Sequence, residues 1–192
     1  IHFLGYWLIK RDIKEVKVTE FSQTFAMPNK APSEIKPIRL FMERYINPIK
    51  HKVILDPFAR NCKLVTITND LNPNTEAMHH MRAEDFLDMM QEHNVKADVV
   101  IYDPPYSVRQ ISECFTEVGI KATQQDTQSS FYTKIKDRIR PLVRQGGMVL
   151  SFGWNSMGVG KKGFEYEEIM LVTHGGVHND TICVAQRRVE HG

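Results

Sequence analysis

The sequence predicts one α/β domain, built on a mostly parallel sheet with an antiparallel hairpin at its C-terminal end. Short apolar runs alternate with helical patterns along the middle of the chain, which is typical of a parallel sheet. Two further apolar runs flank a loop that contains Gly175 and Gly176, which indicates a hairpin. At 192 residues, 42% of them apolar, the chain is long enough to bury a core.

The first third of the chain is expected to form an edge strand, a helix and two buried strands. Apolar residues at helical spacing follow Pro37, which suits a first helical turn, and the Asn47-Pro48 pair ends this helix. The expected strands are Val16–Phe21 at the sheet edge, His51–Leu55 and Leu64–Thr68.

The remaining elements are placed by periodicity and by turn residues. Helices are expected around Thr75–His80, from Asp85 onward, from Val108 to Val118, and from Phe131 to Leu142 with a kink at Pro141. Strands are expected near Met81–Ala83, at Val99–Tyr102, at Met148–Phe152, and in the hairpin at Tyr166–Val172 and Thr181–Gln186. The polar stretch Gln124–Ser130 is expected to be a loop.

Composition limits the classes of function. A net charge of +2 does not indicate a broad nucleic-acid-binding surface, so an anionic partner must be held by a local patch. Cys62, Cys114 and Cys183 fit neither a disulfide framework nor a zinc site, which favours a reducing, cytoplasmic compartment. No apolar run approaches the roughly 18–20 residues of a membrane span, so we expect no membrane association.

The stretch that organises the chain is a buried strand, Val99–Tyr102, that runs into Asp103-Pro104-Pro105-Tyr106. Prolines cannot donate hydrogen bonds to a sheet and restrict the residue before them. We therefore expect a stiff, exposed loop at the carboxyl end of a central strand. In open α/β sheets this is where ligands bind.

Acidic residues also follow the other early strands. Asp56 and Asp70 close the first two buried strands and Asp85 follows the third. Such acids suit a ligand with hydroxyl and amino donors, and Asp70, with Leu71 beside it, fits a contact to ribose hydroxyls. The alternative reading is that these acids cap helices or lie in solvated loops. The absence of Gly-x-Gly-x-x-Gly disfavours a dinucleotide ligand.

With these motifs the chain resembles the S-adenosylmethionine-dependent amino-group DNA methyltransferases, adenine-specific type. Asp103-Pro104-Pro105-Tyr106 matches the catalytic motif of that family in full, and residues 56–61 resemble its cofactor loop. Met27–Pro37 resembles the segment over the methionine part of the cofactor, and Gly147–Trp154 resembles the fifth strand of the family. The resemblance covers roughly residues 20–187.

The resemblance implies a Rossmann-like methyltransferase sandwich with a mostly parallel seven-stranded sheet and an antiparallel C-terminal hairpin. Residues 1–192 would form one domain, with residues 1–50 packed over the cofactor and no separate target-recognition domain. The implied cofactor is S-adenosylmethionine, with no metal. The implied cofactor-binding residues are Pro28, Lys36, Asp56, Pro57, Phe58, Ala59, Asn61, Asp70, Leu71, Asp85 and Phe86.

The implied reaction is methylation of the exocyclic N6 amine of adenine in DNA. The Asp103 carboxylate and the Pro104 carbonyl would accept the two amine hydrogens and turn the nitrogen lone pair toward the sulfonium methyl. Alignment of this kind can contribute about 7–11 kcal/mol. Pro105 stiffens the loop, and Tyr106 would stack on the flipped-out base.

Two departures from the family pattern stand out. Ala59 and Asn61 replace the two glycines of the cofactor loop, and we expect Asn61 to keep the turn, because Asn tolerates positive φ. We also expect no sizeable target-recognition domain within these 192 residues. We expect the loop Gln124–Ser130, a partner subunit or a dimer to supply recognition.

Features on the substrate side are open to two readings. Lys136 and Arg140 begin a basic row that Arg144 continues, which suits a phosphate backbone or a solvated helix face. Arg109 suits a flanking nucleotide or an exposed helix surface, and Trp154 suits the base pocket or the core. His174, His178 and Asp180 suggest a metal site only weakly, because methyl transfer to nitrogen needs no metal.

Three functions remain open at this point. An adenine-specific DNA methyltransferase leads, because Asp103 opens the motif. An RNA adenine or protein-amide methyltransferase is the first alternative, although related motifs in those enzymes more often begin with Asn. A catalytically silent, nucleic-acid-binding subunit of the same fold is the third.

Overall fold

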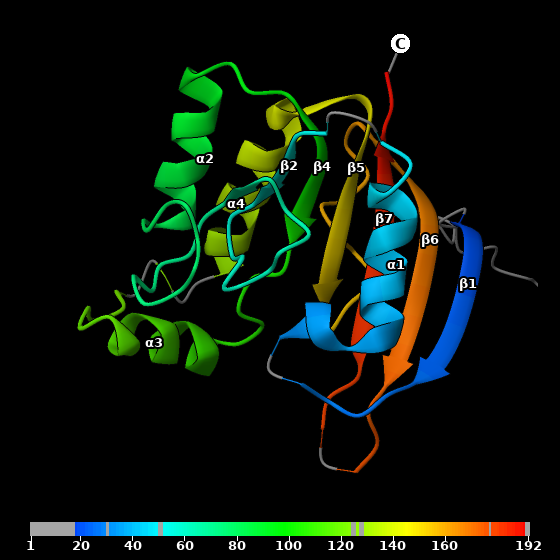
Figure 1. Cartoon of the computed structure of the whole chain (residues 1–192), viewed down its shortest axis with the longest axis horizontal. Coiled ribbons are helices and arrows are strands. Elements are labelled where there is room, and N and C mark those ends of the chain that lie inside the picture. The colour runs from blue at the N-terminus through cyan, green and yellow to red at the C-terminus, as the bar shows by residue number, and fades with distance from the viewer. Residues whose placement is uncertain are drawn as a thin grey trace, which may run out of the picture.

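A computed structural model describes residues 18–29, 31–49, 52–123, 126, 129–176 and 178–190. Within these ranges the chain forms one seven-stranded sheet with helices on both faces (Figure 1). The elements are β1 (Val18–Phe25), the 3-10 turn η1 (Pro32–Glu34), α1 (Lys36–Ile46), β2 (Ile54–Asp56), β3 (Ile67–Thr68), α2 (Ala83–Glu92), β4 (Ala97–Tyr102), α3 (Val108–Glu117), α4 (Ser129–Leu142), β5 (Val143–Gly153), β6 (Phe164–Thr173) and β7 (Thr181–Arg188).

The strand order is β1-β6-β7-β5-β4-β2-β3. β7 runs antiparallel to both of its neighbours, β5 and β6, and every other pairing is parallel. The carboxyl ends of β2, β4 and β5 therefore meet at one edge, where the arrowheads point in Figure 1. This confirms the predicted mostly parallel sheet with a C-terminal antiparallel hairpin.

Helix α1 covers one face of the sheet, in front of β7 in Figure 1. Pro37 lies in its first turn, where a missing N–H costs nothing. Its buried residues Ile38, Phe41, Met42 and Ile46 pack on apolar side chains of the sheet. Because these residues recur at helical spacing, the sequence predicted this helix nearly to its ends.

Helices α2, α3 and α4 cover the other face. Their fully buried side chains include Phe86 of α2, Ile111 of α3 and Ile135 of α4, which pack with Leu55 and Val100 of the sheet. Pro141 lies inside the last turn of α4, and β5 begins directly after it. The chain is thus a three-layer sandwich with a hydrophobic core on each side of the sheet.

Two predicted elements are wrong. Residues 75–80 form bends and an isolated bridge from His79 to Asn69 instead of a helix, because the side chain and carbonyl of Asn72 bind the backbone N–H groups of Asn74 and Thr75. The strand predicted at Met81–Ala83 does not form, since Ala83 already begins α2. The predicted edge strand does form, as β1, and pairs in parallel with β6.

Other predicted boundaries shift. β1 extends to Phe25, beyond the predicted Phe21, and the predicted start at Val16 lies outside the described residues. β3 contains only Ile67 and Thr68 of the predicted Leu64–Thr68. β5 begins at Val143, ahead of the predicted Met148. In the described part of the chain, no helix is long and apolar enough to cross a membrane.

Candidate active site at the carboxyl ends of the strands

A cleft of about 550 Å³ opens at the carboxyl ends of β2, β4 and β5. Its volume falls in the range of small-molecule sites, about 300–1,000 Å³. The residues that line the cleft are Asn29, Ala31, Pro32, Ser33, Glu34, Arg39, Met42, Asp56, Phe58, Ala59, Arg60, Asn61, Cys62, Lys63, Leu64, Ile101, Asp103 and Phe152.

Asp56, the last residue of β2, lies on the floor of the cleft and is 3% exposed. Its Oδ1 accepts a hydrogen bond from the backbone N–H of Phe58 at 2.9 Å. Burial raises the pKa of Asp56 well above its ordinary value despite that hydrogen bond, and the nearby charges of Asp103 and Asp70 raise it further. The charges of Asp56 and Asp103, which both line the cleft, therefore oppose each other.

The Pro57–Cys62 loop turns at Arg60 rather than at Asn61. Arg60 has φ +48°, a left-handed conformation that residues other than glycine rarely adopt. This corrects the expectation that Asn61 takes positive φ. The Asn61 side chain instead accepts a hydrogen bond from the backbone N–H of Glu76 at 2.8 Å. Ala59, Arg60 and Asn61 line the cleft, whereas Pro57 does not.

The predicted ribose-contacting pair lies beside this loop. The Asp70 carboxylate accepts hydrogen bonds from the backbone N–H groups of Arg60 at 3.1 Å and Asn72 at 2.8 Å. Leu71 is half-buried and packs against the core under α2 to α4. The fully buried Asn69, which sequence reasoning missed, ties this loop to Pro57 and Met81. The sequence signal that could have indicated this role is a polar residue directly after β3.

Asp70 and Leu71 do not line the cleft, and four other predicted cofactor contacts also lie outside its lining. Phe86 is fully buried in the core, with its ring 5.6 Å from that of His79, and Asp85 is exposed on α2. Pro28 and Lys36 do not line the cleft, although residues between them, Asn29 to Glu34, do. The segment around η1 thus borders the cleft through different side chains from those predicted.

The Asp103–Tyr106 loop follows β4 and is fixed at both ends. The phenolic hydroxyl of Tyr106 donates a hydrogen bond to Oδ1 of Asp103. The Tyr106 backbone N–H donates to the Gln110 side chain at 2.7 Å, and the Tyr132 hydroxyl donates to the Pro105 carbonyl at 2.8 Å. No donor among the described residues reaches the Pro104 carbonyl. The loop is also half-buried, with Pro104 buried, which corrects the expectation of an exposed loop.

The carboxyl of Asp103 lies in an unusual electrostatic setting. Burial raises the pKa of Asp103 to about 6, while the hydrogen bond from Tyr106 and the positive charge of Arg60 oppose the rise. Burial also raises the pKa of the Tyr106 hydroxyl well above its ordinary value. Asp103 can consequently change charge near neutral pH, which is characteristic of functional carboxylates.

Two aromatic rings stand side by side next to this loop. The ring of Tyr106 lies 5.6 Å from that of Trp154, with an angle of 47° between their planes. Trp154 follows β5 and is 44% exposed, so it belongs to the surface rather than to the core. A side chain at Gly153 would contact the Tyr106 ring, since an added Cβ would lie 3.7 Å from Cε1. The two rings can offer a stacking surface beside Asp103.

The basic side chains predicted to touch substrate all have partners within the chain. The Lys136 ammonium lies 5.8 Å from the centroid of the Tyr102 ring, and burial lowers the pKa of Lys136. Arg140 binds Asp137 and the Val159 carbonyl. Arg109 pairs with Glu113 at 2.7 Å but is 87% exposed. None of the three lines the cleft.

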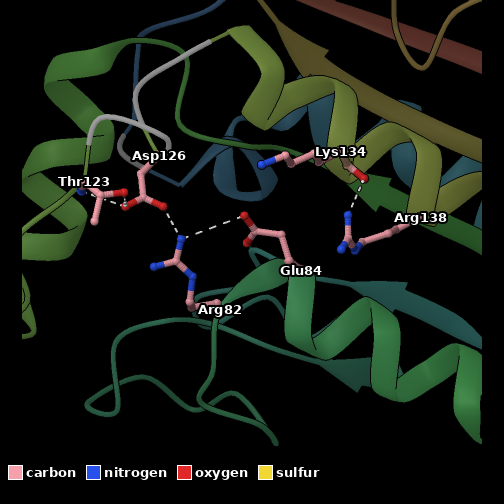
Figure 2. A network of polar contacts seen from close by, with 6 residues as sticks. All are labelled: Arg82, Glu84, Thr123, Asp126, Lys134 and Arg138. Atoms are coloured by element: carbon pink, nitrogen blue, oxygen red, sulfur yellow. Dashed lines mark hydrogen bonds and ion pairs between the residues drawn. The ribbon is translucent and has the colours of Figure 1, made fainter.

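The loop between α3 and α4 is anchored to the start of α2 (Figure 2). Asp126, 3% exposed, accepts hydrogen bonds from the backbone and hydroxyl of Thr123 at 2.7 Å each and from the guanidinium of Arg82. Arg82 also reaches Glu84 at 3.9 Å and lies over the ring of Phe115. Of the stretch Gln124–Ser130, predicted to contact substrate, Asp126 thus faces inward; residues 124, 125, 127 and 128 lie outside the described residues.

His174, beside the loop of the C-terminal hairpin, has structural partners. The two ring nitrogens of His174 lie 2.8 Å from the Ala26 carbonyl and 2.9 Å from the Thr181 hydroxyl. Asp180 accepts a hydrogen bond from the His174 backbone. The described ranges contain no group of three or more His, Cys, Asp or Glu side chains arranged to hold a metal ion.

Solved structures of methyltransferases share this fold. The N-methyltransferase NodS from Bradyrhizobium japonicum WM9, in complex with S-adenosylhomocysteine, is 10% identical with a TM-score of 0.56 over 84% of this chain and 90% of its own. NSun6 from Pyrococcus horikoshii, with SFG, is 14% identical with a TM-score of 0.55 over 85% and 53%. SMU.776, complexed with S-adenosylhomocysteine, is 15% identical with a TM-score of 0.54 over 78% and 48%.

These likenesses define the fold. The chain has the Rossmann-like fold of S-adenosylmethionine-dependent methyltransferases. It spans about half the length of several of the matched proteins, 48% of SMU.776 and 50% of TrmN from Thermus thermophilus. No protein-family model matches the chain. No curated protein matches it either.

Proposed function

We propose that this chain is an adenine-specific DNA methyltransferase that transfers a methyl group from S-adenosylmethionine to the exocyclic N6 amine of adenine. The observation that carries the proposal is the position of the Asp103–Tyr106 loop. It follows the central strand β4, and Asp103 lines the same cleft as Asp56. The fold is that of S-adenosylmethionine-dependent methyltransferases, some of them solved with S-adenosylhomocysteine.

The residues of the cleft suit the cofactor. Asp56 in the cleft and Asp70 behind the Pro57–Cys62 loop offer carboxylate oxygens for hydroxyl and amino groups, and the volume of about 550 Å³ accommodates a nucleoside-sized ligand. Ala59, Asn61 and the segment around η1 form the walls. S-adenosylmethionine, when bound, supplies an activated methyl group on a sulfonium, so the protein has to position the acceptor and exclude competing reactions.

Asp103 and Pro104 are assigned to the acceptor. The Asp103 carboxylate and the Pro104 carbonyl accept the two hydrogens of the amine, which directs the nitrogen lone pair toward the cleft. The proton released on methylation has an acceptor in the Asp103 carboxylate, whose pKa of about 6 lies near neutral pH. The rings of Tyr106 and Trp154 stack on the extruded base.

The wider assignments follow from the substrate. We assign the exposed Arg109 to a nucleotide beside the target adenine. Lys136 and Arg140 are assigned to the phosphate backbone of the DNA, and they must leave their present contacts to reach it. Selection of the target sequence is assigned to a partner subunit or a second copy of the chain. Methylation of RNA adenine or of a protein amide is treated as an outcome of the test.

The proposal is tested by offering labelled S-adenosylmethionine to the purified chain with duplex DNA, single-stranded DNA, RNA and a glutamine-containing protein in competition. The proposal expects label in DNA, recovered as N6-methyladenine after digestion. It also expects no label with Asp103→Ala, and nearly wild-type label with Asp88→Asn on the distant surface of α2. Label found only in RNA or only in protein would show that the substrate is that molecule instead of DNA. Binding of the cofactor without any methylated acceptor would contradict catalysis.

A further inference from the structure

One peptide unit of the Asp103–Tyr106 loop is held by both of its polar groups. The Pro105 carbonyl accepts a hydrogen bond from the Tyr132 hydroxyl at 2.8 Å, and the Tyr106 N–H donates one to Oε1 of Gln110 at 2.7 Å. The two groups belong to the same peptide, which is trans, so they point in opposite directions. The peptide is therefore clamped from two sides, by one side chain of α4 and one of α3.

Capping of α3 accounts for only part of this arrangement. Ser107 and Gln110 have the spacing of a capping box, and the Ser107 hydroxyl accepts a hydrogen bond from the Gln110 N–H at 3.2 Å. In a capping box the side chain of the later residue returns to the N–H of the cap residue. Here it reaches one residue further back, to Tyr106. The Tyr132 contact spans 27 residues and takes no part in capping.

The two prolines link this peptide to the one before it. The ring of each proline fixes φ at about −65°, so that only ψ can rotate at either residue. The chain is held before them by β4, which ends at Tyr102, and after them at the Pro105–Tyr106 peptide. The Pro104 carbonyl lies between these two fixed points. Its direction therefore depends on whether the Pro105–Tyr106 peptide stays in place.

The Pro104 carbonyl needs support of this indirect kind. It is one of the two acceptors assigned to the amine, and no donor among the described residues engages it. The other acceptor, Asp103, has a support of its own in the hydrogen bond from the Tyr106 hydroxyl. Methyl transfer depends on the alignment of the acceptor amine, so both oxygens have to be held in position.

We propose that Tyr132 and Gln110 are positioning residues that hold the Pro105–Tyr106 peptide and thereby aim the Pro104 carbonyl at the acceptor amine. The catalytic meaning of this inference rests on the proposed function, whereas the clamp is a property of the folded chain alone. Burial raises the pKa of the Tyr132 hydroxyl above its ordinary value, so this group stays a hydrogen-bond donor at neutral pH.

The clamp is tested without activity by the hydrogen exchange rate of the Tyr106 amide, followed by NMR of the isotopically labelled chain. Gln110→Met removes the acceptor and should speed exchange about fivefold, as expected for one lost hydrogen bond. Tyr132→Phe should speed it by a comparable factor, because its hydroxyl holds the other end of the same peptide. Gln110→Glu keeps an acceptor oxygen and should keep the amide protected.

The catalytic test measures kcat for methyl transfer to duplex DNA at a pH above the acidic limb. Tyr132→Phe and Gln110→Met should each lower kcat about tenfold, between the effect of one lost hydrogen bond and that of a 1 Å misplacement. The double variant should lose little more than either single variant, because both substitutions release one peptide. Neither residue lines the cleft, so the affinity for S-adenosylmethionine should keep its wild-type value.

Tyr166→Phe is the matched control. The Tyr166 hydroxyl also donates to a backbone carbonyl at 2.8 Å, that of Met157, outside the Asp103–Tyr106 loop. Its loss should lower stability to a similar extent as the Tyr132→Phe substitution, but it should leave kcat and the exchange of the Tyr106 amide unchanged.

The outcomes separate the clamp from the reaction. Unchanged exchange of the Tyr106 amide in Tyr132→Phe overturns the clamp, whether or not the chain methylates DNA. Faster exchange without methylation of any acceptor supports the clamp and overturns the proposed function. A loss of kcat that Tyr166→Phe reproduces, or losses in the single variants that multiply in the double variant, overturn the positioning role.

Discussion

The phenolic hydroxyl of Tyr106 donates a hydrogen bond to the carboxyl of Asp103, three residues earlier in the chain. Two prolines between them hold the pair in a tight loop, and the Gln110 side chain fixes the Tyr106 backbone. The pair therefore fixes where the carboxylate points before any ligand arrives. Preorganised acceptors of this kind need no rearrangement at the moment of reaction.

Tyr106→Phe should weaken methyl transfer more strongly at low pH than at high pH. The phenylalanine keeps the ring beside Trp154 but removes the hydrogen bond that lowers the pKa of Asp103, so the carboxyl takes up its proton at a higher pH. The acidic limb of the pH profile should rise by about one unit, in line with a lost hydrogen bond to a charged group. Tyr132→Phe removes a hydroxyl that binds the Pro105 carbonyl instead, and should leave the limb in place.

Asp103→Asn should stabilise the folded chain at neutral pH. Asp103 has a pKa of about 6 in the folded state against 3.8 ordinarily, so between these values the folded state binds more protons than the unfolded state. The free energy of unfolding therefore falls by up to about 3 kcal/mol as pH rises by two units from about 4 to 6, and it stays level above that. Urea unfolding across this range should show a fall that Asp103→Asn reduces. A parallel pH dependence in the two proteins would contradict the assignment.

Arg44→Ala should loosen α1 from the sheet. The buried carboxylate of Glu168 on β6 accepts hydrogen bonds from Arg44 at 2.6 Å and from the Tyr45 hydroxyl at 2.8 Å. Removal of the arginine leaves a buried charge with one donor, which should cost about 1–3 kcal/mol in the free energy of unfolding. Arg39→Ala on the same helix breaks a longer, exposed pair with Glu43 at 3.9 Å. That control should cost less than about 0.5 kcal/mol, and equal effects would refute the role of Glu168.

Gly158→Ala should destabilise the segment that follows Trp154. Gly158 has φ +50°, and an added Cβ would lie 2.1 Å from the Gln186 side-chain oxygen. Gln186 is fully buried and bonds Val159 and Gly160, so it cannot move aside cheaply. Strain and clash together should cost more than about 2 kcal/mol, measured by thermal or chemical unfolding.

Gly176→Ala provides the matched comparison. Its φ is +61°, but nothing lies within 4 Å of the added Cβ. It should therefore show the backbone strain alone, about 1 kcal/mol. A Gly158→Ala variant as stable as Gly176→Ala would show that the Gln186 contact is soft.

Local patterns predicted the central part of the fold and the position of Asp103. A buried apolar run followed by two prolines has few alternatives, and the strand formed as expected, whereas its loop is half-buried rather than exposed. The pairing of β1 with β6 joins segments more than 140 residues apart, and no local pattern specifies it. Phe86 is in the core because α2 begins at Ala83, two residues before the predicted start.

The candidate site was predictable as a location and less so in its details. Arg60, rather than Asn61, turns the Pro57–Cys62 loop, because hydrogen bonds to Asn69 and Asp70 hold the backbone there against the local preference of arginine. Helical spacing placed Lys136 in an exposed basic row. Its ammonium instead lies near the Tyr102 ring, a contact across the layers that spacing does not reveal.

The most direct test of the account is sequencing of DNA, with base resolution for N6-methyladenine, from cells that express the wild-type chain or Asp103→Ala. The account predicts N6-methyladenine at a defined sequence with the wild type, and none above the vector control with Asp103→Ala at equal protein level. Wild-type DNA without N6-methyladenine, under conditions where the purified chain binds S-adenosylmethionine, would contradict adenine methylation of DNA. Equal methylation with both chains would contradict the role of Asp103.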